Sequence, residues 1–125
     1  MTTSAQRVGT GTIKGIDLVA YFTNDPERSI AFYRDVLGMT PTEIDDQGRG
    51  AEFSLADGST FGVWKPDHDA SGACVMLAVG DIVEALAEFR ARGAQLSEPE
   101  DTPVCRMAFG TDPDGNTIIV HQRKN

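Results

Sequence analysis

The 125-residue sequence has little of what several common protein classes require. Its two cysteines, Cys74 and Cys105, are too few and too isolated for a disulfide framework or a zinc-binding cluster. It has no run of about 18 apolar residues that could span a membrane, and residues 1–12 lack the apolar segment of a secretory signal. We therefore expect a cytoplasmic protein with reduced thiols and no membrane association, with residues 1–12 as a mobile N-terminal segment.

Positive charge is also scarce, because 11 Lys and Arg residues stand against 19 Asp and Glu residues, for a net charge of −8. A protein that binds nucleic acid needs a Lys and Arg footprint for the phosphate backbone, so we expect no nucleic-acid partner. The hydrophobic fraction of 40% is enough for one ordinary folded domain, which we place at residues 13–125.

The sequence contains an internal repeat. GIDLVAYFTNDPERSIAFYRDVLG, which begins at Gly15, and ACVMLAVGDIVEALAEFRARG, which begins at Ala73, both read as a strand followed by an acid and a helix. In each copy the acid, Asp25 or Asp81, can accept from free N–H groups of the first helical turn. Each helical pattern ends at a glycine, Gly38 or Gly93, which can adopt the left-handed conformation of a helix stop.

Each predicted helix is followed by three strand-like runs. They are MTPTEI, GAEFSLADG and STFGVWK in the first copy, and AQLSEP, RMAFGTDPDG and NTIIVHQ in the second. Gly58 and Gly115 fall at the hairpin bends, and Asp112 and Asp114 are expected to form the second turn. The pattern predicts two βαβββ modules, at residues 13–65 and 73–122, joined by a linker that contains His68. The fold class is therefore α+β.

These features together resemble the vicinal oxygen chelate superfamily, which includes glyoxalase I, extradiol dioxygenases, fosfomycin-resistance transferases and bleomycin-binding proteins. The resemblance covers residues 13–122 and depends on the repeat, on DPDGN, and on a spaced motif formed by Asp25, Ser29, Phe32, Tyr33, Leu37 and Gly38. It implies two tandem βαβββ modules in a curled mixed sheet, with a concave pocket on one face and the helices packed outside.

The resemblance also implies where a metal would be held. Enzymes of the superfamily bind a divalent metal through His, Gln and Glu side chains on the first and last strand of each module. The matching positions here carry Leu18, Gly62, Cys74 and Ile119. Leucine and isoleucine have no donor atom, glycine has no side chain, and one thiol is a poor ligand for a hard cation. We therefore expect no metal and no cofactor.

The residues that line the concave face follow from strand alternation, because side chains i and i+2 lie on the same face. The predicted ligand-binding residues are Leu18, Phe22, Gly62, Trp64, Cys74, Met76, Ile119 and His121. The opposite faces of these strands are aliphatic and are predicted to pack beneath the helices; they carry Val19, Val63, Val75, Leu77, Val79, Ile118 and Val120. Alternatively, the first set is a second core layer or is covered by a partner chain.

Individual residues of this face allow more than one role. Trp64 and its repeat mate His121 are expected near the rim, where Trp64 could stack on a ligand or form an interface. His121 could bond a ligand, act as a base, or be a solvated histidine at a strand end. Cys74 is expected to be a buried, inert thiol. The sequence does not determine which face Glu52 and Arg106 occupy.

Three functions remain open at this point. The first is a metal-free protein of the glyoxalase and bleomycin-resistance type that binds a small organic molecule, such as an antibiotic or another aromatic metabolite. The second is a glyoxalase-like lyase or a dioxygenase-related enzyme that uses non-standard ligands or no metal. The third is a subunit whose concave face meets another protein. A homodimer is expected, because two half-sheets leave strand edges to cover.

Overall fold

A computed structural model of the protein describes residues 11–67 and 72–124. Residues 1–10 of the expected N-terminal segment, and His68, lie outside the described residues. The first module comprises β1 (Ile13–Phe22), α1 (Pro26–Ala31), the π-helical turn η2 (Phe32–Val36), β2 (Glu43–Ile44), β3 (Gly50–Ser54) and β4 (Thr60–Trp64). The second comprises β5 (Ala73–Val79), α2 (Ile82–Ala91), β6 (Glu100–Asp101), β7 (Cys105–Thr111) and β8 (Thr117–Arg123). No helix in the described part of the chain has the length and hydrophobicity to cross a membrane.

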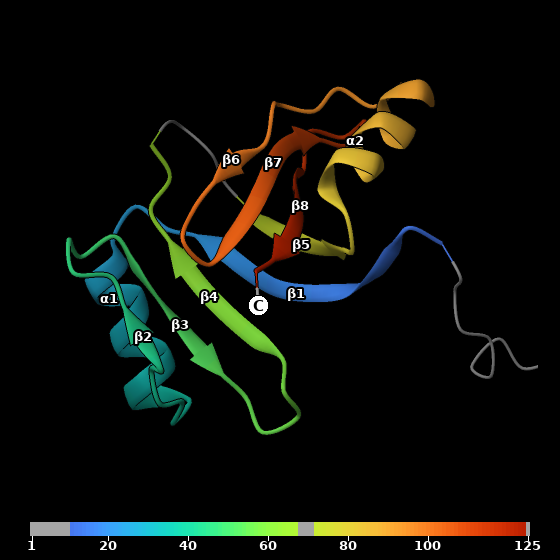
Figure 1. Ribbon diagram of the computed structural model, residues 1–125. Helices are drawn as coiled ribbons and strands as arrows, with labels where there is room; N and C mark the ends of the chain where they lie inside the picture. Colours follow the sequence, from blue (N-terminus) through green and yellow to red (C-terminus); the bar gives the residue numbers. More distant parts are fainter. Residues whose placement is uncertain (1–10, 68–71, 125) are drawn as a thin grey trace, which may run out of the picture.

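All eight strands form one curled sheet in the order β2-β3-β4-β1-β5-β8-β7-β6 (Figure 1). The first strands of the two modules, β1 and β5, pair antiparallel at its centre, with Ala20 opposite Cys74. Each first strand then pairs in parallel with the last strand of its own module, β1 with β4 and β5 with β8. The predicted α+β fold with two βαβββ modules is therefore confirmed.

Both helices begin where the sequence predicts, but the first has an irregular end. The side chain of Asp25 accepts from the backbone N–H of Arg28 at 3.1 Å, and Asp81 caps α2 in the same way. After Ala31 the first helix widens into η2, where the N–H of Leu37 bonds the carbonyl of Phe32. Gly38 follows with φ of +72°, the left-handed conformation expected of a helix stop.

The strand expected directly after α2 begins later in the chain than the sequence predicts. The AQLSEP run forms only an isolated bridge between Leu96 and Gly110, and the strand β6 begins later, at Glu100. Pro99 ends this run and has no N–H for a strand ladder. Leu96 instead lies over Gly110, where an added Cβ would come within 2.6 Å of its side chain.

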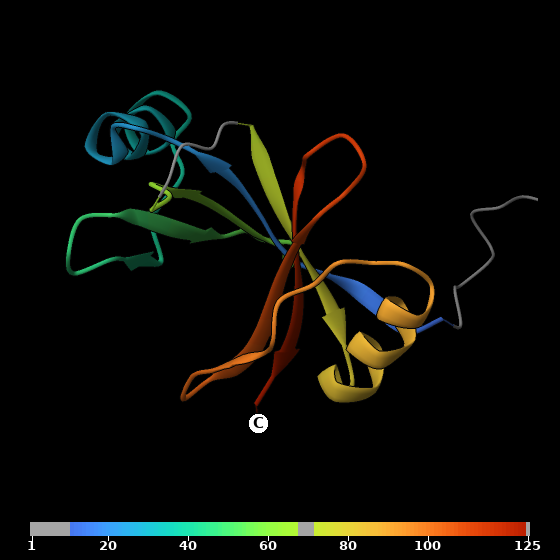
Figure 2. The same cartoon turned by 90° about the horizontal axis from the view of Figure 1, so that it is seen from above.

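The helices pack on the outer face of the sheet, at opposite ends (Figures 1 and 2). Beneath α1 lies a cluster of Ile30, Ala51, Phe53 and Val63. Beneath α2 lies a second cluster, formed by Val79, Ile82, Ala85, Leu86, Ala108 and Val120. Three of the positions predicted to face the helices, Val63, Val79 and Val120, belong to these clusters, and the side-chain alternation that underlies the site prediction holds for them.

Candidate functional site

The face of the sheet that does not carry the helices, which we call the concave face, has its own apolar cluster. Leu18, Ala20, Cys74 and Ile119 meet there with 5–8% of their surface exposed. Partly buried side chains pack against these four: Phe22, Met76, Met107 and Phe109. The structure thus brings together five of the eight predicted site residues. Their close packing also means that the floor of this face is core, and that the partly buried residues around it form its accessible surface.

Gly62 and Trp64 extend the concave face across β4. A Cβ added to Gly62 would lie 3.5 Å from the Cβ of Ala20, so this glycine sits beside the apolar cluster. Trp64 lies opposite Phe22 in the strand register and is 39% exposed. The guanidinium of Arg49 lies 5.7 Å from the centre of the indole ring, within the range of a cation–π contact. Trp64 is thus a partly exposed residue held at the edge of the face.

His121 is fixed by a residue that the sequence did not identify. Its Nδ1 lies 2.6 Å from Oδ2 of Asp17, and both side chains are only 11% exposed. Because an ionised carboxylate can only accept hydrogen bonds, Nδ1 donates to Asp17. The other oxygen of Asp17 forms an ion pair with Arg123, whose Nη2 lies 2.7 Å away. Of the alternatives left open for His121, the solvated histidine at a strand end therefore does not apply.

Asp17 reaches the concave face because β1 is irregular at that point. The register between β1 and β5 shifts between Ile16 and Leu18, which places an extra residue in β1. Simple alternation would put Asp17 on the same side as Val19, towards the helices, whereas a bulge re-aims a side chain. Asp17 and His121 then meet across β5, where Ala78 lies directly beside His121 in the register.

The structure also settles the facing of Glu52 and Arg106. Glu52 pairs with Gly62 in the register, so its side chain lies on the concave face. Partial burial raises the pKa of Glu52, the nearby Glu43 raises it further, and His121 lowers that pKa. Arg106 shares its facing with Ala108 of the helix-side cluster and lies 3.6 Å from Asp101, so it is not part of this face.

Glu52 and His121 lie on the same face of the sheet but come from different modules. The two residues belong to β3 and β8, which have β4, β1 and β5 between them. The concave face therefore combines an apolar floor with a carboxylate from one module and a carboxylate-bound imidazole from the other.

The metal position of the superfamily lies within the apolar floor. Three of the four implied ligand positions, Leu18, Cys74 and Ile119, are mutual neighbours, and Gly62 adjoins Leu18. Burial raises the pKa of the Cys74 thiol, so its thiolate form, the one that binds metals, is disfavoured. This donor set does not fit a divalent metal. Across residues 11–67 and 72–124, no three His, Cys, Asp or Glu side chains are grouped so that they could hold one.

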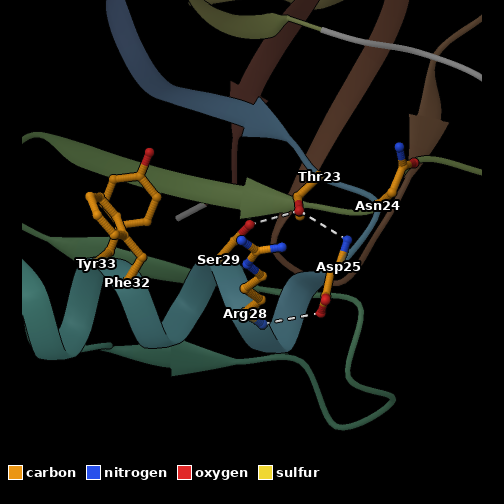
Figure 3. A pocket seen from close by; sticks show the side chains of 7 residues that line it. All are labelled: Thr23, Asn24, Asp25, Arg28, Ser29, Phe32 and Tyr33. Carbon is orange, nitrogen blue, oxygen red and sulfur yellow. Dashed lines mark hydrogen bonds between the residues drawn. The ribbon is translucent and has the colours of Figure 1, made fainter.

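A cavity of about 430 Å³ lies away from this face, beside the start of α1 (Figure 3). Its lining consists of Thr23, Asn24, Asp25, Arg28, Ser29, Phe32 and Tyr33. Several polar groups there bond one another: the hydroxyls of Thr23 and Ser29 are 2.7 Å apart, and Asp25 caps the helix. A smaller cavity of about 230 Å³ lies beneath α2 and includes Leu77 and Ile118. The linings of these two cavities include no predicted ligand-binding residue.

Comparison with known proteins agrees with this architecture. Residues 15–120 match the sequence profile of the Glyoxalase/Bleomycin resistance protein/Dioxygenase superfamily. No curated protein matches the chain.

Solved structures share the fold at low sequence identity. Methylmalonyl-CoA epimerase from Mycobacterium tuberculosis is 20% identical with a TM-score of 0.73, over 98% of this chain and 97% of that one. A superfamily member from Vibrio splendidus 12B01 is 18% identical with a TM-score of 0.67, over 88% and 100%. The Mn(II)-bound glyoxalase from Novosphingobium aromaticivorans is 26% identical with a TM-score of 0.65, over 89% of this chain and 39% of that one.

Proposed function

The chain belongs to the Glyoxalase/Bleomycin resistance protein/Dioxygenase superfamily, and we propose that it binds a small organic molecule on its concave face without a metal ion. The observation that carries the proposal is the apolar cluster on this face, which occupies the superfamily's metal position with side chains that cannot chelate. Binding of this kind requires apolar walls and a few well-placed polar groups, and needs no metal.

The accessible part of the face suits an aromatic ligand. Phe22, Phe109 and Trp64 offer aromatic surface, and Met76 and Met107 offer flexible thioethers that adapt to the shape of a ring. The polar groups Glu52 and His121 lie on the same face and would orient the molecule. Both cysteines are free and buried, which agrees with a reducing compartment, and we include a cytoplasmic location in the proposal.

A second candidate is an enzyme that acts without a metal, as a lyase or a dioxygenase-related protein. The specific observation that favours it is the imidazole of His121, which is held by Asp17 in the manner of a positioned base. The activities named for the similar structures, among them epimerase and glyoxalase, are not carried over, because their fold does not determine the reaction.

Methionine methyl NMR tests the binding proposal with an internal control. Met76 and Met107 belong to the concave face, whereas Met39 packs in the cluster beneath α1. With 4-nitroanisole as an uncharged aromatic probe and EDTA present, we expect saturable shifts of the Met76 and Met107 methyl signals and none at Met39. Binding that requires added Mn²⁺, Ni²⁺ or Zn²⁺, or shifts confined to Met39, would contradict the proposal.

A further inference from the structure

The contact between His121 and Asp17 determines which kind of ligand group the imidazole can bond. His121 donates its Nδ1 hydrogen to Asp17 at 2.6 Å. In the neutral imidazole the other nitrogen, Nε2, then carries a lone pair and can only accept. Asp17 is in turn held by Arg123 and lies on the strand bulge, so the ring orientation is set by groups on two strands. Asp17 is thus a positioning residue for the Nε2 atom.

The charges around this imidazole restrict which group a ligand can bring to it. Glu52 lies on the same concave face, with Glu43 opposite it on the neighbouring strand, and Asp17 contacts Nδ1 of the ring. Arg123 is the cation that contacts Asp17, and its side chain is 68% exposed. A ligand carboxylate would meet repulsion from these acids, whereas a neutral hydroxyl would not. A weakly acidic hydroxyl is also the donor that a lone pair on Nε2 needs.

From this geometry, and building on the proposed function, we infer that the ligand is a hydroxylated aromatic molecule whose phenolic proton is accepted by His121. The ring of the ligand would contact the aromatic and thioether side chains of the concave face. In the proton transfer the phenolic O–H bond breaks, its electron pair stays on oxygen, and an N–H bond forms at Nε2. The products are a phenolate and an imidazolium, and no electron is gained or lost.

A matched pair of probes tests this inference separately from the proposed function. 4-Nitrophenol and 4-nitroanisole share the nitroaromatic ring, but only the first has an acidic hydroxyl. At a pH where free 4-nitrophenol is mostly neutral, we expect the bound form to show nitrophenolate absorption. It should also bind about tenfold more tightly than 4-nitroanisole, the factor expected of one hydrogen bond to a charged group.

Three substitutions identify the group that accepts the proton. H121Q removes the basic nitrogen and should abolish both the phenolate absorption and the preference for 4-nitrophenol over 4-nitroanisole. D17N should lower the ionised fraction of bound 4-nitrophenol, because an amide no longer fixes the Nδ1–H tautomer. H68Q removes the only other histidine of the sequence and should change neither result.

The outcomes are distinct. Equal binding of both probes without phenolate absorption overturns the inference and leaves the proposed function intact, whereas no shift of Met76 or Met107 with either probe overturns both. If H121Q fails to fold, ¹⁵N spectra of the wild-type imidazole give the answer, because Nε2 must become protonated as 4-nitrophenol saturates the site. An unprotonated Nε2 at saturation would refute proton acceptance by His121.

Discussion

The substitution Trp64→Ala tests whether this residue at the rim of the concave face contributes mainly to folding stability or to ligand affinity. Full burial of a tryptophan removes up to about 250 Å² from water, and Trp64 is 39% exposed, which leaves roughly 150 Å² buried. At about 25 cal/mol per Å² this is worth about 4 kcal/mol. That value is an upper bound, because the unfolded chain already covers part of its apolar surface.

We expect W64A to lower the free energy of unfolding by about 2–3 kcal/mol, which includes about 0.5–1 kcal/mol for the lost contact with Arg49. For a domain of this size the melting temperature should fall by about 10 °C. Guanidinium denaturation followed by far-UV circular dichroism is the suitable assay, because the substitution removes the only indole. Affinity for 4-nitroanisole should fall about tenfold if the indole stacks on the probe.

Phe32→Ala is the matched control, because Phe32 is 47% exposed and lies on η2. F32A should lose stability of a similar order without any change in probe affinity. A loss well above about 4 kcal/mol in W64A, with unaltered binding, would mean that Trp64 is a core residue without a binding role. Equal weakening of binding by F32A and W64A would mean that the affinity reports general destabilisation.

Three further predictions concern charge, metal content and assembly. The raised pKa of Glu52 means that the folded protein binds a proton more tightly there than the unfolded chain, so this residue's contribution to stability falls as pH rises above the ordinary value of 4.5. E52Q should remove that slope and stabilise the protein at neutral pH by less than about 1 kcal/mol, because Glu52 is only partly buried and solvent screens its charge. An unchanged pH dependence of urea unfolding would contradict this expectation. Elemental analysis of the purified protein should give far less than one transition metal per chain, and one Zn, Ni, Fe or Mn retained after mild chelation would refute the reasoning from Leu18, Gly62, Cys74 and Ile119. Light scattering should show a homodimer at micromolar concentration, and a monomer alone would count against that expectation.

The predictable part of the structure is the part governed by local backbone chemistry. Asp25 and Asp81 cap helices because their side chains can reach free N–H groups, and Gly58 and Gly115 adopt positive φ in the hairpin turns. Strand alternation then places the apolar residues correctly, as the cluster of Leu18, Cys74 and Ile119 demonstrates. Each of these features depends on neighbours a few residues away in the sequence.

The features that escaped prediction depend on contacts between distant segments. Asp17 joins His121 only because the register of β1 shifts against β5, and nothing in the sequence near Asp17 signals that shift. The AQLSEP run forms only an isolated bridge, between Leu96 and Gly110 of β7, and the extent of that pairing depends on a segment that is distant in the sequence. Alternation alone could not orient Glu52, since a single bulge in β3 would have reversed it.

The repeat itself explains why the chemistry of the concave face could not be read from either module. Trp64 and His121 are repeat mates on β4 and β8, yet one is an exposed indole beside Arg49 and the other a partly buried imidazole bound to Asp17. Two modules with the same backbone plan thus contribute different groups to one surface. Because Asp17 comes from the first module and His121 from the second, the proposed proton acceptor exists only when β1 and β5 pair. The central strand pair therefore determines the orientation of the His121 imidazole.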